Sequence, residues 1–210
     1  MKVSLGYGGG ITAPQKTAAL AAYDILRDGG TAIEAMVAAA ATIAVTYPHM
    51  NGIGGDAFWL VKKHNQNPIA ISGCGYSASK ASVSWYGDRG YTEGIPTRGG
   101  ASALTVPGAV ASWIKALSLV EKPMPVKNIL ENAVSYARDG FAVTENQFLC
   151  TTSKYNDLYQ VDGFAETFLV DGQPPKYGFK LIQDALKNTL KVLGQDGLDS
   201  FYRGDLAKSN

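Results

Sequence analysis

The chain has 210 residues, of which 46% are hydrophobic and 18% are charged, and these values are ordinary for a soluble globular protein. Its 19 basic and 18 acidic residues give a formal net charge of +1, so no charge excess marks a surface for nucleic acid or for an anionic membrane. The composition excludes a disordered chain and favours small molecules or proteins as partners.

The N-terminal segment, the longest apolar run and the two cysteines indicate the compartment in which the protein is expected. Residues 1–14 contain one lysine followed by glycines, which does not fit a secretory signal peptide. The longest apolar run, residues 35–45, is shorter than the roughly 20 residues that a membrane helix needs. Cys74 and Cys150 match no metal-ligand spacing, and either one disulfide or two free thiols is compatible with them. We expect a cytoplasmic protein without a metal or a cofactor.

Two helices are predicted first along the chain. Apolar residues recur at helical spacing between Pro14 and Gly29. Thr31 and Glu34 then form a capping box, in which each side chain accepts a hydrogen bond from the other's backbone amide, and a second helix follows through about Val45. This second helix is apolar on every face, so we expect it to be buried on all sides.

A glycine-rich turn follows the second helix and leads into a strand. The sequence is YPHMNGIGGDAFWLV, residues 47–61, and Pro48 cannot continue the helix. Glycines permit positive φ and let another backbone segment, or a ligand, come close. The turn residues singled out for this reason are Gly52, Gly54, Gly55 and Asp56.

The remaining elements alternate less regularly. We expect strands at 57–62, 68–71 and 101–106 and helices at 109–120, 126–137 and 184–193. Layered α and β structure follows, with a helix–strand core portion at 1–120 and a mainly helical portion at 121–210. Three strands cannot cover the apolar surface of the helices. We therefore expect further strands from another polypeptide or from residues beyond Asn210.

Two alternative chemistries carry weak signals. Gly52, Gly54 and Ala57 match a G-x-G-x-x-A dinucleotide pattern, but that motif needs a strand before it and a helix after it, and here the order is reversed. His49 and His64 have no cysteine or carboxylate at ligand spacing, so a metal site is not predicted. A structural role for His49 is favoured over a general base, because a base needs a partnered nucleophile.

No local signature of a nucleophile is present either. The chain lacks a G-x-S-x-G elbow, and Cys74 has no basic neighbour that would lower its pKa. Arg98 is a lone cation among small residues, which could hold a carboxylate in a fork or lie solvated in a loop. For Tyr76 and Tyr91, a role in binding and a purely structural or solvated position both stay open.

Five separated blocks of the chain nevertheless resemble the large subunit of the gamma-glutamyltranspeptidase family. They occur in the family's order and span nearly the whole chain. The blocks are GGTAIEA from Gly29, YPHMNGIGGDAF from Tyr47, LTVPGAVASW at 104–113, YARDGFAVTE at 136–145 and LDSFYRGDLA at 198–207.

This resemblance implies an α+β fold, the αββα sandwich of the N-terminal nucleophile hydrolases, to which this chain gives one part and a second chain the rest. It implies a precursor that cuts itself and exposes a threonine at the start of a small subunit. The amine of that threonine acts as base for its hydroxyl, which attacks a small-molecule amide and forms an acyl-enzyme. The resemblance therefore places no catalytic residue on this chain and expects oxyanion stabilisation from the small subunit.

The resemblance also points to substrate-binding positions. Family members carry an arginine shortly after the second strand that binds the substrate's α-carboxylate, and here that region reads ISGCGYSAS. Depending on the register, Cys74 or Tyr76 takes this position, and losing such a bidentate arginine costs about 1.5 to 3 kcal/mol. Arg98 is our hypothesis for a compensating cation. The YPHM sequence resembles relatives such as oxamate amidohydrolase and cephalosporin acylase-like proteins, and a non-catalytic binding protein on the same scaffold is the alternative.

Overall fold

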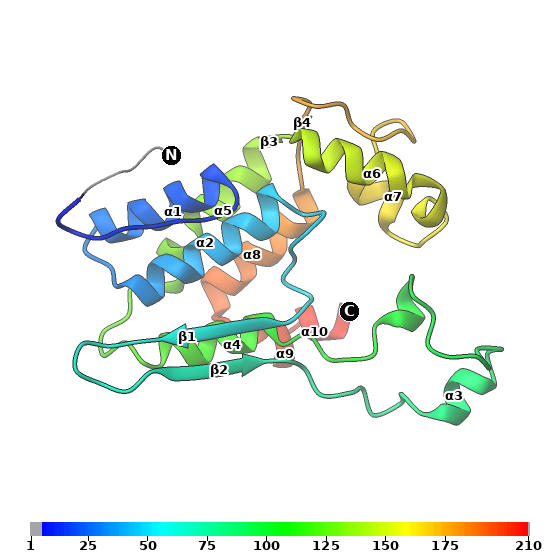
Figure 1. The fold of residues 1–210 in the computed structure, drawn as a ribbon, viewed down its shortest axis with the longest axis horizontal. Helices are drawn as coiled ribbons and strands as arrows, with labels where there is room; N and C mark the ends of the chain where they lie inside the picture. The colour runs from blue at the N-terminus through cyan, green and yellow to red at the C-terminus, as the bar shows by residue number, and fades with distance from the viewer. Residues whose placement is uncertain (1–5, 210) are drawn as a thin grey trace.

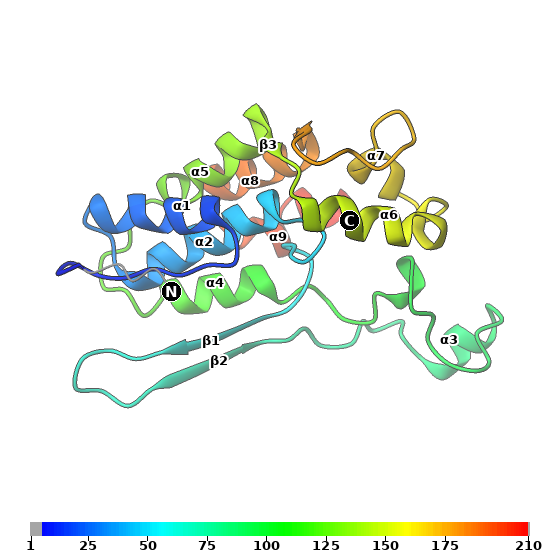
Figure 2. The ribbon, with the colours of Figure 1, turned by 45° about the horizontal axis from the view of Figure 1, so that its top comes forward.

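The computed structural model describes residues 6–209 as a layer of helices above one β-hairpin. The layer comprises α1 (Lys16–Arg27), α2 (Ala32–Thr46), α5 (Val126–Asp139) and α8 (Asp184–Asp196). Figure 2 shows α4 (Ala109–Leu117) between this layer and the hairpin of β1 (Ala57–Val61) and β2 (Ile69–Gly73). The other elements are α3 (Val83–Gly87), the 3-10 helix η1 (Gly100–Ser102), β3 (Phe141–Ala142), α6 (Glu145–Leu158), α7 (Phe164–Phe168), β4 (Lys180–Leu181), α9 (Ser200–Arg203) and α10 (Leu206–Ser209).

The predicted capping box opens α2. The Glu34 amide donates to Thr31 Oγ1 at 3.3 Å, and Glu34 Oε2 accepts from the Thr31 amide at 2.6 Å. Glu34 is buried, and its Oε1 accepts from the Met124 amide at 2.6 Å, which ties α2 to the segment before α5. Burial raises the pKa of the Glu34 carboxyl, but the hydrogen bonds from Met124 and Thr31 outweigh this effect, and the net pKa is lowered. Glu34 therefore both caps α2 and fixes its start against the loop that leads into α5.

Helix α2 is buried on most of its surface, but Met36 is 45% exposed, so the expected burial on all sides is not complete. It contacts α1 on one side and α5 and α4 on others. Such a helix is stable only where neighbours cover most of its apolar surface. The buried residues of α2 are Ile33, Glu34, Ala35, Val37, Ala38, Ala39, Ala41, Thr42, Ala44, Val45 and Thr46.

The hairpin has one face toward α4 and one face open. The strands are antiparallel, with Val61 opposite Ile69 and Ala57 opposite Gly73. Trp59 lies on the inner face, where its Nε1 donates to Ser112 Oγ of α4 at 2.8 Å. On the outer face, the exposed fractions of Phe58 and Leu60 are 72% and 77%.

Within residues 6–209, β1 pairs with β2 alone. Each strand of the hairpin therefore presents an unpaired edge beside an exposed apolar face.

The second half of the chain is mainly helical, and its periodicity is confirmed. Helix α5 ends at Gly140, whose φ of +87° favours glycine. The two-residue strands β3 and β4 pair antiparallel, with Phe141 opposite Leu181, and connect the helical layer to α6 and α7, which project from it in Figure 1. Buried positions on the predicted inward faces are Ile129, Leu130, Ala133, Leu190 and Leu193.

The predicted strand at 101–106 is wrong. Gly99 has a φ of +81°, and the chain then forms the 3-10 turn η1, whose Ser102 hydroxyl donates to the Gly99 carbonyl at 2.6 Å. Only one bridge, between Ser77 and Thr105, remains of the strand pairing. The predicted helix at 109–120 is shorter than expected, because α4 ends at Leu117.

None of the helices in the part of the chain that the structure describes is long and apolar enough to cross a membrane.

Candidate functional site

Three segments that are distant in sequence meet at one end of the hairpin. The amides of Gly108 and Ala109, at the start of α4, donate to the Gly55 carbonyl at 3.0 and 2.8 Å. Asp56 Oδ1 accepts from the amide of Gly75, just past β2, at 3.4 Å. The glycine turn is thus held both by the N-terminus of a helix and by the segment that leaves the hairpin.

Two backbone segments come closest to each other at Gly75 and Gly108, and not at the glycines of the turn. A Cβ added at Gly75 would lie 1.6 Å from the Val106 carbonyl oxygen, and one at Gly108 would lie 2.0 Å from the Gly73 carbonyl oxygen. Distances below 3.0 Å are essentially never found for real Cβ atoms. These positions therefore require glycine, because backbone faces backbone with no side chain to move aside.

The glycines of the predicted turn have open space around them instead. A Cβ at Gly54 or Gly55 would meet nothing within 4 Å, and one at Gly52 would meet only the Gly54 nitrogen at 3.9 Å. The segment at the start of α4 approaches Gly55 on its carbonyl side, but no backbone contact requires a missing side chain at these three residues. None of the three has a positive φ, so that part of the expectation is wrong. Approach of a ligand stays a prediction. The sequence reasoning missed the close approach at Gly73, Gly75 and Gly108, although the glycine-containing sequences SGCG and PG could have been singled out.

The structure places Cys74 and Tyr76 on one exposed segment of this junction. The Tyr76 carbonyl accepts from the Val106 amide at 2.9 Å, and the Ala78 amide donates to the Leu104 carbonyl at 2.9 Å. The backbone is thus fixed while the side chains point outward, with Tyr76 91% exposed and Cys74 an exposed free thiol. We call residues 73–78 the junction segment. Its role in binding a substrate stays a prediction.

Arg98 lies in the exposed loop between α3 and η1. Its Nη1 donates to the neighbouring Thr97 carbonyl at 3.3 Å. Among residues 6–209, no hydrogen bond or ion pair brings its guanidinium to Cys74 or Tyr76. The structure therefore groups two of the three predicted substrate-binding residues on one segment and leaves Arg98 in a separate loop.

His49 belongs to a polar cluster at the start of the glycine turn. Its Nε2 lies 2.7 Å from Asn146 Oδ1 of α6, which also accepts from the Tyr47 hydroxyl at 3.0 Å. The Tyr47 and His49 rings meet edge to face, with 4.2 Å between centroids. This arrangement ties the turn to α6 and agrees with a structural role for His49. His64 lies exposed in the hairpin loop.

The described residues contain no cluster of three or more His, Cys, Asp or Glu side chains that could hold a metal ion. The G-x-G-x-x-A pattern is followed by β1 and not by a helix, which is the wrong context for a dinucleotide.

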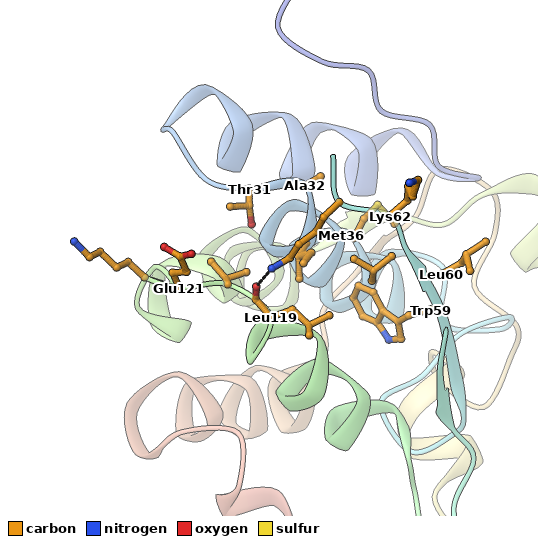
Figure 3. A pocket seen from close by; sticks show the side chains of 13 residues that line it. Thr31, Ala32, Met36, Trp59, Leu60, Lys62, Leu119 and Glu121 are labelled. Carbon is orange, nitrogen blue, oxygen red and sulfur yellow. Dashed lines mark hydrogen bonds between the residues drawn. The ribbon is translucent and has the colours of Figure 1, made fainter. Parts of the chain in front are cut away.

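A pocket of about 650 Å³ lies at the other end of the hairpin, between the start of α2, the end of β1 and the loop after α4 (Figure 3). Apolar side chains such as Met36 and Trp59 form much of its lining. The Lys63 amine, which also lines it, donates to the Leu119 carbonyl at 2.5 Å, shown as the dashed line in Figure 3. The candidate site is placed at the junction segment instead, because the family resemblance assigns the substrate-binding position to Cys74 or Tyr76.

Comparison with known proteins gives a consistent result. The family model described as gamma-glutamyltranspeptidase matches residues 18–209. The oxamate amidohydrolase proenzyme of Klebsiella pneumoniae is 48% identical over 93% of this chain, which corresponds to 37% of that protein.

Two solved structures share the fold. The gamma-glutamyltranspeptidase from Pseudomonas nitroreducens complexed with L-DON is 31% identical, with a TM-score of 0.84, and the match covers 96% of this chain and 58% of that one. The cephalosporin acylase from Bacillus halodurans is 28% identical, with a TM-score of 0.83, over 99% of this chain and 42% of that one. These likenesses confirm the predicted α+β fold. The chain spans 37% of the length of the curated amidohydrolase that it matches.

Proposed function

Because this chain belongs to the gamma-glutamyltranspeptidase family, as its five sequence blocks predict, we propose that it is a large-subunit part of a self-processing amidohydrolase or acyltransferase. The observation that carries this proposal is the family match over residues 18–209, which includes the glycine turn, the junction segment and α4. The family includes hydrolases of amides, and the proposal assigns that class of reaction to the assembled protein.

The proposed reaction uses a threonine at the N-terminus of a companion chain. Its amine takes the hydroxyl proton, Oγ bonds to the amide carbonyl carbon, and the C–N bond breaks as the leaving amine takes up a proton. Water or another amine then attacks the ester, releases the acyl group and restores the hydroxyl. In this scheme the present chain supplies no nucleophile and forms part of the wall around the substrate.

The outer face of the hairpin is the proposed seat of the companion chain. Phe58 and Leu60 are both largely exposed there, and burying such side chains stabilises an association by about 1.5 to 3 kcal/mol each. The unpaired edges of β1 and β2 offer backbone donors and acceptors to further strands. Strand pairing and apolar burial together would complete the sandwich.

The junction segment is the proposed wall of the substrate pocket. It presents Cys74 and Tyr76, neither of which carries a fixed positive charge, where the family resemblance places an arginine. We therefore propose an amide other than a γ-glutamyl compound as the preferred substrate. A small oxamate-like amide is the first candidate, because a relative of that name is 48% identical to this chain.

The test uses the assembled protein. Intact-mass analysis should reveal a companion polypeptide whose first residue is threonine. Incubation with oxamate and hydroxylamine should then yield a hydroxamate, since hydroxylamine intercepts an acyl-enzyme. The control is a companion chain with its first threonine changed to alanine. A protein that carries the companion but forms no hydroxamate from oxamate, γ-glutamyl or glutaryl amides would support a non-catalytic binding protein instead.

A further inference from the structure

The LDSFYRGDLA block contains a tyrosine whose hydroxyl reaches the start of α4. Tyr202 Oη donates to the Pro107 carbonyl at 2.8 Å and accepts from the Ala111 amide at 2.9 Å. Gly108, the N-cap residue of α4, has no side chain that could accept from the free amides of the first turn. Tyr202 therefore supplies, from 91 residues away, the cap that the helix lacks.

The capped segment is also the one that organises the candidate site. Gly108 and the next residue donate to the Gly55 carbonyl, and the Gly108 backbone packs directly on that of Gly73. A displacement of Pro107 and Gly108 would consequently move the glycine turn and the end of β2 together. The two hydrogen bonds of Tyr202 come from α9, an element that is separate from the hairpin.

The hydroxyl of Tyr202 is held in place and kept protonated. Its ring packs edge to face on Phe201, with 5.1 Å between centroids, and Phe201 is buried in the core. Burial raises the pKa of Tyr202, and the hydrogen bond from the Ala111 amide only partly opposes this. A protonated hydroxyl is the state that can donate to Pro107.

We propose that Tyr202 is a positioning residue for amide cleavage, because it fixes the start of α4 and through it the junction segment that borders the substrate. This inference rests on the proposed function. It assigns a role in the reaction to a block of sequence that lies away from the junction segment along the chain.

The test compares Tyr202→Phe with the wild type in the assembled protein. Tyr23→Phe, on the exposed side of α1, is the matched control because it removes the same hydroxyl at a distance from α4. We expect Tyr202→Phe to raise KM for the cleaved amide about tenfold with kcat within about twofold. Backbone hydrogen exchange at Gly108 and at Ala109 should accelerate about tenfold, while the control changes neither quantity.

Each outcome decides the inference. Unchanged KM with faster exchange would make the hydroxyl a purely structural cap and overturn the positioning role. Unchanged exchange at the start of α4 would overturn it directly. If the wild type cleaves no amide, the proposed function fails separately, and the exchange measurement alone then decides whether Tyr202 fixes the junction. Thermal unfolding of each variant verifies that the compared proteins are folded.

Discussion

Glu34→Gln gives the sharpest stability test, because this substitution keeps the shape of the side chain and removes its charge. Three donors meet the carboxylate: the Thr31 amide at 2.6 Å and the Thr31 hydroxyl at 2.7 Å on Oε2, and the Met124 amide at 2.6 Å on Oε1. A carboxamide has one oxygen. If that oxygen faces Thr31, the NH₂ group faces the Met124 amide, donor against donor.

The magnitude follows from these contacts. One hydrogen bond to a charged acceptor is lost, worth about 1.5 to 3 kcal/mol, and the Thr31 bonds weaken as their acceptor becomes neutral. The uncharged amide avoids the cost of burying an ion, which offsets part of the loss. We expect Glu34→Gln to lower the free energy of unfolding by about 2 kcal/mol at pH 7.

The pH dependence supplies an independent check. The pKa of Glu34 is lowered from its ordinary value of 4.5, so the native state binds this proton less tightly than the unfolded state does. The stabilisation is therefore complete above the unfolded pKa and is lost as the pH falls through the folded pKa. The difference between wild type and variant should be largest near neutrality and should narrow on acidification.

The assay is denaturant unfolding of the purified protein, followed by tryptophan fluorescence at pH 7 and at several pH values below 4.5. Glu131→Gln is the control, because it makes the same substitution at an exposed position of α5. A Glu34→Gln protein within about 0.5 kcal/mol of this control at pH 7, or a difference that grows as the pH falls, would refute the reasoning.

Three further predictions concern the junction and the hairpin. Gly75→Ala should destabilise the protein by more than about 2 kcal/mol in a thermal or denaturant measurement, because its Cβ would overlap a carbonyl oxygen, whereas Gly87→Ala, with open space around it, should cost far less. Cys74→Arg should raise kcat/KM for a γ-glutamyl amide about tenfold or more relative to Cys74→Gln, and equal values for the two variants would exclude this position from carboxylate binding. Leu60→Lys should abolish co-purification of the companion chain, while Leu149→Lys on α6 should not, and equal recovery would contradict the proposed seat.

Much of the fold could be predicted because its signals are local. The Thr31 capping box, the apolar helix α2 and the two successive strands near 57–62 and 68–71 each depend on a few consecutive residues, and the structure contains all three. These features form because of hydrogen bonds within the local backbone and because one element buries its own apolar residues. Such causes need no knowledge of distant segments.

Elements that depend on weaker signals were missed. Helix α6 has a polar sequence with little apolar periodicity, although its Thr144 hydroxyl accepts from the Gln147 amide at 3.1 Å, and the T-x-x-Q spacing could have indicated its start. The segment at 101–106 has strand-like residues, but the positive φ of Gly99 turns the chain before pairing can extend. Here a single backbone conformation outweighs residue propensity.

The candidate site was located by resemblance and not by local chemistry. Cys74 and Tyr76 were identified from the family pattern, and the structure then placed them on one segment. The contacts that hold this segment, Gly73 against Gly108 and Tyr202 against Pro107, join residues far apart along the chain. Proximity of this kind is a property of the tertiary fold, so spacing within a single sequence does not reveal it.

The contact of bare backbones at Gly73, Gly75 and Gly108 has a consequence for how this protein can change over evolutionary time. No side chain lies between the junction segment and the start of α4, so substitutions of side chains cannot gradually change the distance between them. The backbone that carries residues 74 and 76 therefore keeps its position. A change in substrate selectivity must then arise by substitution of the side chains at residues 74 and 76. Relatives with different substrates can consequently share one course of the chain here while they diverge in the residues that it displays.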